Sequence, residues 1–153
     1  MKRVLLAVTC LLTAVFLCAC GKDAVPERYC DSLDEAESLI GFKLTAPESW
    51  NGSTTKTFRV GGRTLEIMYF SGKVLEGKLS KSEGGEDITA YDYGYTGRSI
   101  QVSDGGVTYT LQGNNAEETV CLATWTKGKY SYFLLDGAGK TPEEMVAFCK
   151  EIQ

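Results

Sequence analysis

Apolar and polar residues alternate through most of the middle of the chain, a spacing that is typical of half-buried β-strands. The clearest alternating runs are residues 58–60, 65–69, 100–102 and 107–111. Glycine pairs at 61–62 and 105–106 interrupt these runs, and such pairs indicate tight hairpin turns. We therefore expect two antiparallel hairpins in this part of the chain.

A third hairpin is predicted from residues 120–125 and 130–135, with a turn at Lys127-Gly128. Apolar residues occupy both alternating positions here, which indicates strands covered on both faces, near the centre of the sheet. Residues 74–82 are more polar, and we expect an edge strand because charged edges resist further pairing. Residues 83–98 are rich in Gly, Asp and Tyr and predict a long loop.

Two segments combine helical spacing with capping signals. Residues 32–35 form a capping box and Gly41 is a typical helix end, which predicts a helix over about 33–40. Residues 141–144 form a second capping box with Pro142 at the first helical position, followed by an apolar stripe to the end of the chain.

These elements predict one α+β domain over residues 32–153. Two short amphipathic helices must bury their apolar sides, and the sheet is the available partner. We expect a twisted antiparallel sheet of about six to seven strands, with the N-terminal and the C-terminal helix packed on one face.

The first twenty residues have the order of a bacterial export signal, with a positive start at Lys2-Arg3 and then an apolar stretch. That stretch is about 15 residues long, shorter than the roughly 20 of a membrane-spanning helix. Its end resembles a lipobox, with Leu17 three residues before Cys20. We predict a signal peptide at 1–19, a lipidated (palmitate-type) Cys20, and a short linker at 20–31.

A diacylglycerol on Cys20 would hold the protein on the extracytoplasmic face of the cell membrane, because two acyl chains leave a bilayer very slowly. The alternative is an ordinary cleaved signal in which Cys20 is incidental. The formal net charge is −4, without the clustered Lys and Arg that phosphate binding requires. We therefore expect the membrane, and no nucleic acid, as a partner.

The chain contains no histidine. This excludes Ser-His-Asp and Cys-His nucleophile arrangements and every metal site that uses histidine. The cysteine spacing matches no zinc pattern, and we expect no metal, no cofactor and no catalytic residue. An enzyme built from this sequence would depend on carboxylates, Lys, Tyr or Cys alone.

Three motifs suggest chemistry but fit a structural explanation better. Residues 137–141 end like a phosphate-binding loop, but the glycine that the full pattern requires is replaced by Leu134. The acids of 83–92 do not have the alternating spacing of a calcium loop. Asp87 and Asp92 could act as paired carboxylates in hydrolysis, but nothing in the sequence indicates that they are buried.

Three cysteines remain after the signal and the lipid site, so at most one internal disulfide can form. We predict that any bridge joins Cys30, just before the first helix, to Cys149 in the last helix. Cys121 lies in a predicted central strand and is expected to be a buried free thiol.

Tyrosines are the strongest candidates for a binding surface. Tyr91, Tyr93 and Tyr95 alternate within the predicted long loop, and exposed tyrosines are common contact residues. We hypothesise that they border a ligand or partner site on the sheet face opposite the helices, together with Tyr69. The alternative is that they fold back as a minor core.

The order of motifs resembles a family of uncharacterised domains found in lipoproteins and anti-sigma-factor-associated membrane proteins of Gram-positive bacteria. The resemblance rests on residues 34–36, 40–42, 65–69, 86–88, 123–132 and 141–145. It covers roughly residues 33–153 and is weakest in the tyrosine-rich loop. It implies the fold and a location outside the single membrane, and it assigns no catalytic residue.

We therefore expect a membrane-anchored, non-enzymatic binding or interaction domain with a protein, peptide or glycan partner. The alternative from another class is a carboxylate-based hydrolase or transferase that acts on the cell envelope. A cleft with two close carboxylates of raised pKa would favour the enzyme.

Overall fold

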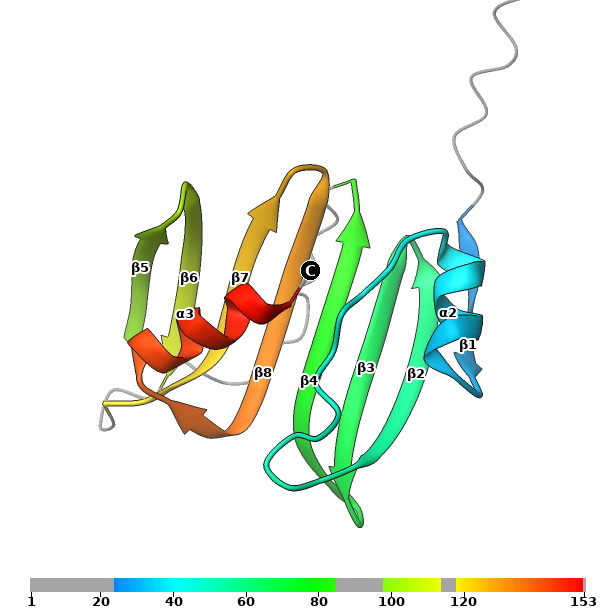
Figure 1. Ribbon diagram of the computed structural model, residues 1–153, viewed down its shortest axis with the longest axis horizontal. Coiled ribbons are helices and arrows are strands. Elements are labelled where there is room, and N and C mark those ends of the chain that lie inside the picture. The colour runs from blue at the N-terminus through cyan, green and yellow to red at the C-terminus, as the bar shows by residue number, and fades with distance from the viewer. Residues whose placement is uncertain (1–23, 85–97, 114–117, 153) are drawn as a thin grey trace, which may run out of the picture.

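The computed structural model of the protein describes residues 24–84, 98–113 and 118–152. These residues form one antiparallel sheet of eight strands in the order β1-β2-β3-β4-β8-β7-β6-β5, with two helices (Figure 1). The strands are β1 (Val25–Cys30), β2 (Thr55–Gly62), β3 (Thr64–Ser71), β4 (Val74–Glu83), β5 (Arg98–Asp104), β6 (Val107–Gly113), β7 (Val120–Lys127) and β8 (Tyr130–Lys140); the helices are α2 (Leu33–Ile40) and α3 (Pro142–Glu151). The predicted α+β class is confirmed, and the strand count exceeds the expected six to seven.

The additional strand is β1, which falls in the segment expected to be a linker. It pairs antiparallel with β2, and its register is irregular between Val25 and Arg28. Most of its residues are exposed, and Pro26 lies near its start. An exposed edge strand of this kind carries no alternation of apolar residues, which is why its sequence resembles a linker.

The prediction that residues 74–82 form an edge strand is wrong. They belong to β4, which lies between β3 and β8 near the middle of the sheet (Figure 1). The polar residues Lys78, Ser80 and Ser82 are buried there, although their composition suggested solvent. The hairpin of β7 and β8 lies near the centre of the sheet, as its double-sided apolar pattern predicted.

Both helices begin where the capping boxes predict, and the first ends at the predicted Gly41. The Ser32 side chain accepts a hydrogen bond from the backbone N–H of Glu35, and Gly41 ends α2 with φ 81°. At α3, the capping box of Thr141 and Glu144 is formed in both directions.

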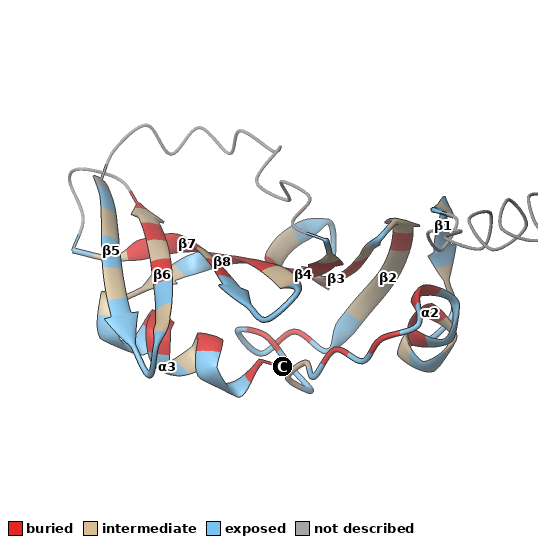
Figure 2. Cartoon of the chain, turned by 90° about the horizontal axis from the view of Figure 1, so that it is seen from above, coloured by how far each residue is buried: buried red, intermediate tan, exposed pale blue. Residues whose placement is uncertain are grey.

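Both helices lie on one side of the sheet but over different parts of it (Figure 2). α2 packs against β1, β2 and β3, whereas α3 packs against β7 and β8. Residues 41–54 run between the helices on the same side (Figure 1). The two helices therefore cover opposite halves of one wide sheet.

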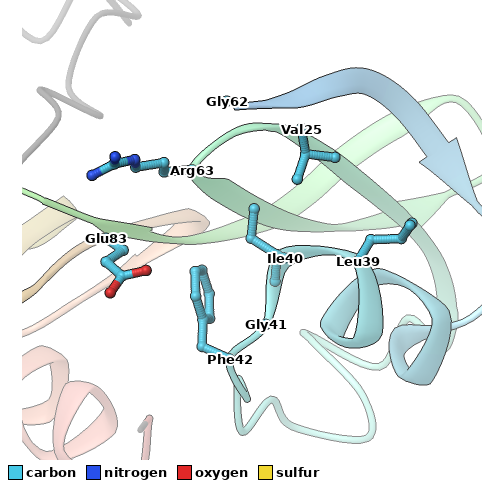
Figure 3. A pocket seen from close by; sticks show the side chains of 8 residues that line it. All are labelled: Val25, Leu39, Ile40, Gly41, Phe42, Gly62, Arg63 and Glu83. Atoms are coloured by element: carbon cyan, nitrogen blue, oxygen red, sulfur yellow. The ribbon is translucent and has the colours of Figure 1, made fainter. Parts of the chain in front are cut away.

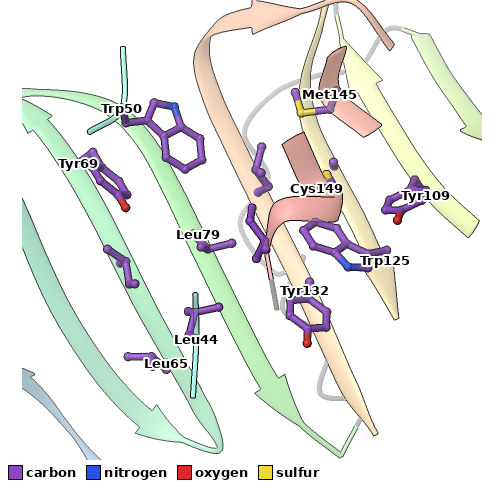
Figure 4. Close-up of a cluster of buried hydrophobic side chains, with 14 of the residues drawn as sticks. Leu44, Trp50, Leu65, Tyr69, Leu79, Tyr109, Trp125, Tyr132, Met145 and Cys149 are labelled. Carbon is purple, nitrogen blue, oxygen red and sulfur yellow. The ribbon is translucent and has the colours of Figure 1, made fainter. Parts of the chain in front are cut away.

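Trp50 anchors the connecting segment 41–54 to the sheet. Its ring is only 2% exposed and lies 5.1 Å from the ring of Tyr69 and 4.9 Å from the ring of Phe148 (Figure 4). Beneath it, Gly77 of β4 leaves the space that the indole fills, because a Cβ at Gly77 would lie 2.3 Å from the ring atom Cε2. This contact closes the core between the two helices.

The core under α3 consists of aromatic rings and sulfur-containing side chains (Figure 4). The rings of Trp125 and Tyr132, on neighbouring strands, are stacked with centroids 4.9 Å apart. Met145 and Cys149 of α3 are buried in the same core. Both rings are almost fully buried in this core.

Candidate functional site

A pocket of about 330 Å³ opens beside α2. It is large enough for a small molecule, since ligand pockets span roughly 300–1,000 Å³. Figure 3 shows the side chains around it. It is lined by Val25 of β1, by residues 39–42 at the end of α2, by Gly62 and Arg63 of the β2–β3 turn, and by Glu83 of β4.

The pocket has an apolar end made by Val25, Leu39 and Ile40 (Figure 3). Phe42 separates this end from the polar one and is itself almost fully buried. Leu39 is 37% exposed, unusually high for a large apolar side chain in this domain. The left-handed Gly41 turns the chain sharply after α2, so Ile40 and Phe42 can both line the pocket.

Arg63 and Glu83 form the polar end. The backbone holds this end together, because the N–H of Glu83 donates to the carbonyl of Arg63 at 3.1 Å. The next N–H, of Gly84, donates to the carbonyl of Lys129 at 3.0 Å. Gly84 also leaves space for the arginine, since a Cβ there would lie 3.2 Å from Nη1 of Arg63.

The polar end carries one uncompensated positive charge among the described residues. Glu83 pairs with the ammonium of Lys129, and this ion pair raises the pKa of Lys129. Arg63 is exposed and makes no ion pair with any described residue. An anionic group at this end would therefore gain a partner without breaking an existing ion pair.

The wall behind Phe42 contains a buried lysine in an aromatic setting. The Lys81 ammonium lies 4.5 Å from the ring centroid of Tyr130, 5.3 Å from that of Tyr132 and 5.5 Å from that of Phe42. It donates a hydrogen bond of 2.6 Å to the carbonyl of Lys43. Burial lowers the pKa of Lys81. These contacts hold the lysine behind Phe42, outside the pocket lining.

The structure does not support the tyrosine site as it was predicted. Tyr69 is fully buried on the helix-covered face, and its hydroxyl donates to the carbonyl of Pro47 at 2.7 Å. The expectation that it borders an exposed surface is therefore wrong, because Trp50 covers it. Tyr91, Tyr93 and Tyr95 lie outside the described residues, and the hypothesis that concerns them stays a prediction.

The centre of the sheet face opposite the helices is not open, contrary to expectation. Leu122, Phe133 and Leu135 form a second buried apolar cluster on this face. Ser80 and Ser82 of β4 are also buried. This part of the face is therefore not available as the broad contact surface that was predicted.

A buried ion cluster completes this face. The Glu66 carboxylate lies 2.5 Å from Arg59 Nη2 and 2.5 Å from Lys78 Nζ. Ser80 donates a long hydrogen bond of 3.5 Å to the same carboxylate. Arg59 also pairs with Glu27 at 2.6 Å, so two carboxylates balance the two cations. This cluster is therefore structural rather than a candidate for ligand binding.

The segment that ends like a phosphate-binding loop binds an internal carboxylate instead. The backbone N–H groups of Ala138 and Gly139 donate to Oδ1 of Asp136, at 3.0 and 3.1 Å. Oδ2 of Asp136 lies 3.0 Å from the ammonium of Lys140. The fully buried Asp136 thus occupies the donors that a phosphate would use, in agreement with the structural reading of this motif.

The predicted bridge between Cys30 and Cys149 is wrong. Both thiols are free. Cys30 lies in β1 at one sheet edge, whereas Cys149 lies on α3 over β7 and β8. β1 and β8 are four strand steps apart, roughly 19 Å, far beyond the reach of a disulfide. Cys121 is buried and forms no disulfide, as predicted.

Several predictions concern residues that the structure does not describe. Cys20, Asp87 and Asp92 lie outside the described ranges, so lipidation and the paired-carboxylate alternative stay predictions. Within the described residues, no three potential ligands come together as a metal site. In the same ranges, no helix has the length and apolar character needed to cross a membrane.

No protein-family model matches the chain, and no curated protein or solved structure is significantly similar to it. The family resemblance of the sequence therefore stays a prediction.

Proposed function

We propose that the protein is a membrane-anchored, extracytoplasmic binding protein whose ligand site is the pocket beside α2. The ligand class that this pocket fits is a small amphipathic anion, with an apolar body and one acidic group. The observation that carries the proposal is the combination of apolar walls with Arg63, a cation without an ionic partner among the described residues.

The apolar walls supply the binding energy in this proposal. A ligand of eight carbons fits within about 330 Å³ and would cover Leu39 and the edge of Phe42. Burial of apolar surface contributes about 25 cal/mol per Å². The exposed Leu39 would thereby lose its contact with water.

The charge at the polar end supplies the selectivity. Because Glu83 is already paired with Lys129, Arg63 presents a net positive charge to the pocket. A hydrogen bond to a charged group contributes about 1.5–3 kcal/mol. A carboxylate or phosphate should therefore bind in preference to a cation of the same length.

The predicted anchor would keep this pocket close to a source of such ligands. Val25 follows Cys20 by five residues, which span at most about 18 Å when extended. If Cys20 carries the lipid, the pocket lies near the bilayer surface, where amphipathic molecules gather.

The binding test uses a chain that begins at Gly21, whose folding is checked first by circular dichroism. Calorimetry should show that octanoate binds more tightly than octyltrimethylammonium. Arg63→Ala should weaken octanoate binding roughly tenfold or more. Leu39→Ser should weaken the binding of both compounds, because it removes apolar wall surface.

Lys73→Ala is the matched control, because Lys73 is also exposed and follows β3 at the end opposite Arg63. This variant should bind octanoate like the wild type. Equal affinity for the anion and the cation, no binding of either, or an unchanged Arg63→Ala variant would refute the proposed site.

The anchor is tested separately by fractionating cells that express the full chain. The wild type should partition with membranes, and Cys20→Ala should not. A wild-type protein that is found unlipidated in the medium would show that the anchor proposal is wrong.

A further inference from the structure

The two edges of the sheet differ in how well they are protected. β1 carries Pro26 and the charged residues Glu27 and Arg28, and its register is irregular. These are the features that prevent an edge from pairing with another chain. β5, at the other edge, has no proline and no charged residue between its two ends, and its ladder with β6 is regular.

The turn of the β5–β6 hairpin shows which backbone groups of β5 point outward. Gly105 and Gly106 form a two-residue turn with φ of 59° and 79°, as a type I′ hairpin requires. The flanking residues of such a turn bond to each other, so the pairing alternates along the strand from Asp104. The N–H and C=O groups of Ser99, Gln101 and Ser103 therefore face away from β6, where no described strand lies.

The sequence of β5 is complementary to itself around Gln101. Antiparallel pairing of two copies at this point would place Gln101 opposite Gln101, Ser99 opposite Ser103, and Ile100 opposite Val102. Residues with outward backbone groups meet each other directly, and about six backbone hydrogen bonds can form.

The apolar side chains of β5 support the same arrangement. Ile100 and Val102 are only partly buried against the core on the helix side. In the self-paired sheet, each would gain an apolar neighbour from the second copy. The opposite face would carry the exposed polar side chains of Ser99, Gln101 and Ser103 from both copies.

We propose that the β5 edge is a self-association surface, on which a second copy of this chain adds its own β5 in antiparallel register centred on Gln101. A pairing of seven residues buries less than the roughly 1,200–2,000 Å² of a stable interface. The association should therefore be weak in dilute solution. Confinement of both copies to one membrane would raise their effective concentration and favour it.

Cysteine cross-linking of the full chain in membranes of expressing cells tests this register. The background is Cys30→Ser, which removes the one described thiol that is not buried. In the proposed pairing the two Gln101 Cα atoms are about 5.5 Å apart. Gln101→Cys should therefore give a covalent dimer with a short bifunctional thiol reagent. Thr110→Cys, its neighbour on β6, should not.

Two further variants test the register itself. Ser99→Cys and Ser103→Cys should cross-link several-fold better when both chains are expressed together than when either is expressed alone. Adding Gln101→Lys to both chains should reduce this product several-fold, because it places like charges at the centre of the interface. Thermal melting of the purified variants checks that the fold is kept.

The proposal is overturned by any of three results. In the first, the folded Gln101→Cys chain gives no dimer. In the second, Thr110→Cys cross-links as well as Gln101→Cys does. In the third, the Gln101→Cys product contains a different protein. The last result would identify β5 as an edge for a foreign strand instead of a second copy.

Discussion

The contact between Trp50 and Gly77 is the most demanding packing feature of the fold, and it gives a sharp prediction. A Cβ at Gly77 would lie 2.3 Å from Cε2 and 2.4 Å from Nε1 of Trp50, more than an ångström inside ordinary contact. Trp50 cannot retreat easily, because the rings of Tyr69 and Phe148 lie about 5 Å away. The replacement Gly77→Ala must therefore displace the indole or bend β4.

The size of the effect follows from these two routes. Overpacking of a core typically costs about 1–3 kcal/mol. Complete loss of a buried tryptophan costs about 3–5 kcal/mol. We expect Gly77→Ala to lower the free energy of unfolding by about 3 kcal/mol and the melting temperature by roughly 10 °C. No backbone strain contributes, since Gly77 does not adopt a positive φ.

Urea denaturation of four proteins measures this effect: the wild type, Gly77→Ala, Trp50→Ala and the double variant. In the Trp50→Ala background the added methyl group has space, so Gly77→Ala should change stability by less than about 0.5 kcal/mol. Gly61→Ala is the matched control, because its Cβ would lie an ordinary 3.4 Å from Glu27. The reasoning is refuted if Gly77→Ala is as stable as the wild type, or is equally harmful without Trp50.

Three further predictions concern charge, pH and capping. Glu66→Ala leaves Arg59 and Lys78 close together without the carboxylate that they share, so urea denaturation should show a free energy of unfolding lower by about 3–5 kcal/mol. A variant as stable as the wild type would contradict the buried ion cluster. Burial raises the pKa of Cys149 from 9.0 to about 12. The contribution of this thiol to stability is therefore complete below pH 9 and is lost as the pH rises through 12. The free energy of unfolding should fall less at alkaline pH in Cys149→Ala than in the wild type, and an unchanged pH profile would count against this. Thr141→Ala removes the hydroxyl that accepts from the backbone N–H of Glu144, while the backbone N–H of residue 141 keeps its bond to the Glu144 carboxylate. Urea denaturation should show a free energy of unfolding lower by about 1 kcal/mol, whereas Thr141→Ser should keep most of the wild-type stability.

Local signals account for the parts of the fold that the sequence predicts correctly. Capping residues define both helices, since a cap needs only its own helix to be formed. The glycine pair at 105–106 likewise defines the turn between β5 and β6. These features depend on residues a few positions apart, so their pattern is visible in the chain itself.

Strand order and polar burial depend on distant partners, and there the sequence misleads. β4 looks like an exposed edge because Lys78 is charged, yet Lys78 is buried beside Glu66 of the neighbouring strand. The partner of β4 on its other side is β8, which lies about fifty positions further along the chain. No local pattern indicates that pairing, and without it the polar strand has no apparent reason to be buried.

The pocket could not be predicted from the sequence for the same reason, because its residues are distant in the chain. Its lining comes from four separate segments, at Val25, at 39–42, at 62–63 and at Glu83. The tyrosines attracted attention because they are neighbours in the chain. Leu39 lies on a short amphipathic helix, and its exposure, like its position beside Arg63 in the pocket lining, is visible only in the structure.

The two proposed surfaces lie at opposite edges of the sheet, and this separation makes them independently testable. The pocket borders β1, whereas self-association uses β5, seven strand steps or roughly 33 Å away. Pairing of two β5 strands would leave both pockets open at the outer ends of the joined sheet. Gln101→Lys should therefore reduce the cross-linking of the Ser99→Cys and Ser103→Cys chains several-fold without changing the affinity for octanoate. Arg63→Ala should weaken octanoate binding without changing the cross-linking. If either variant changes both readouts in a folded protein, the two edges are coupled through the sheet, and the assignment of separate roles fails.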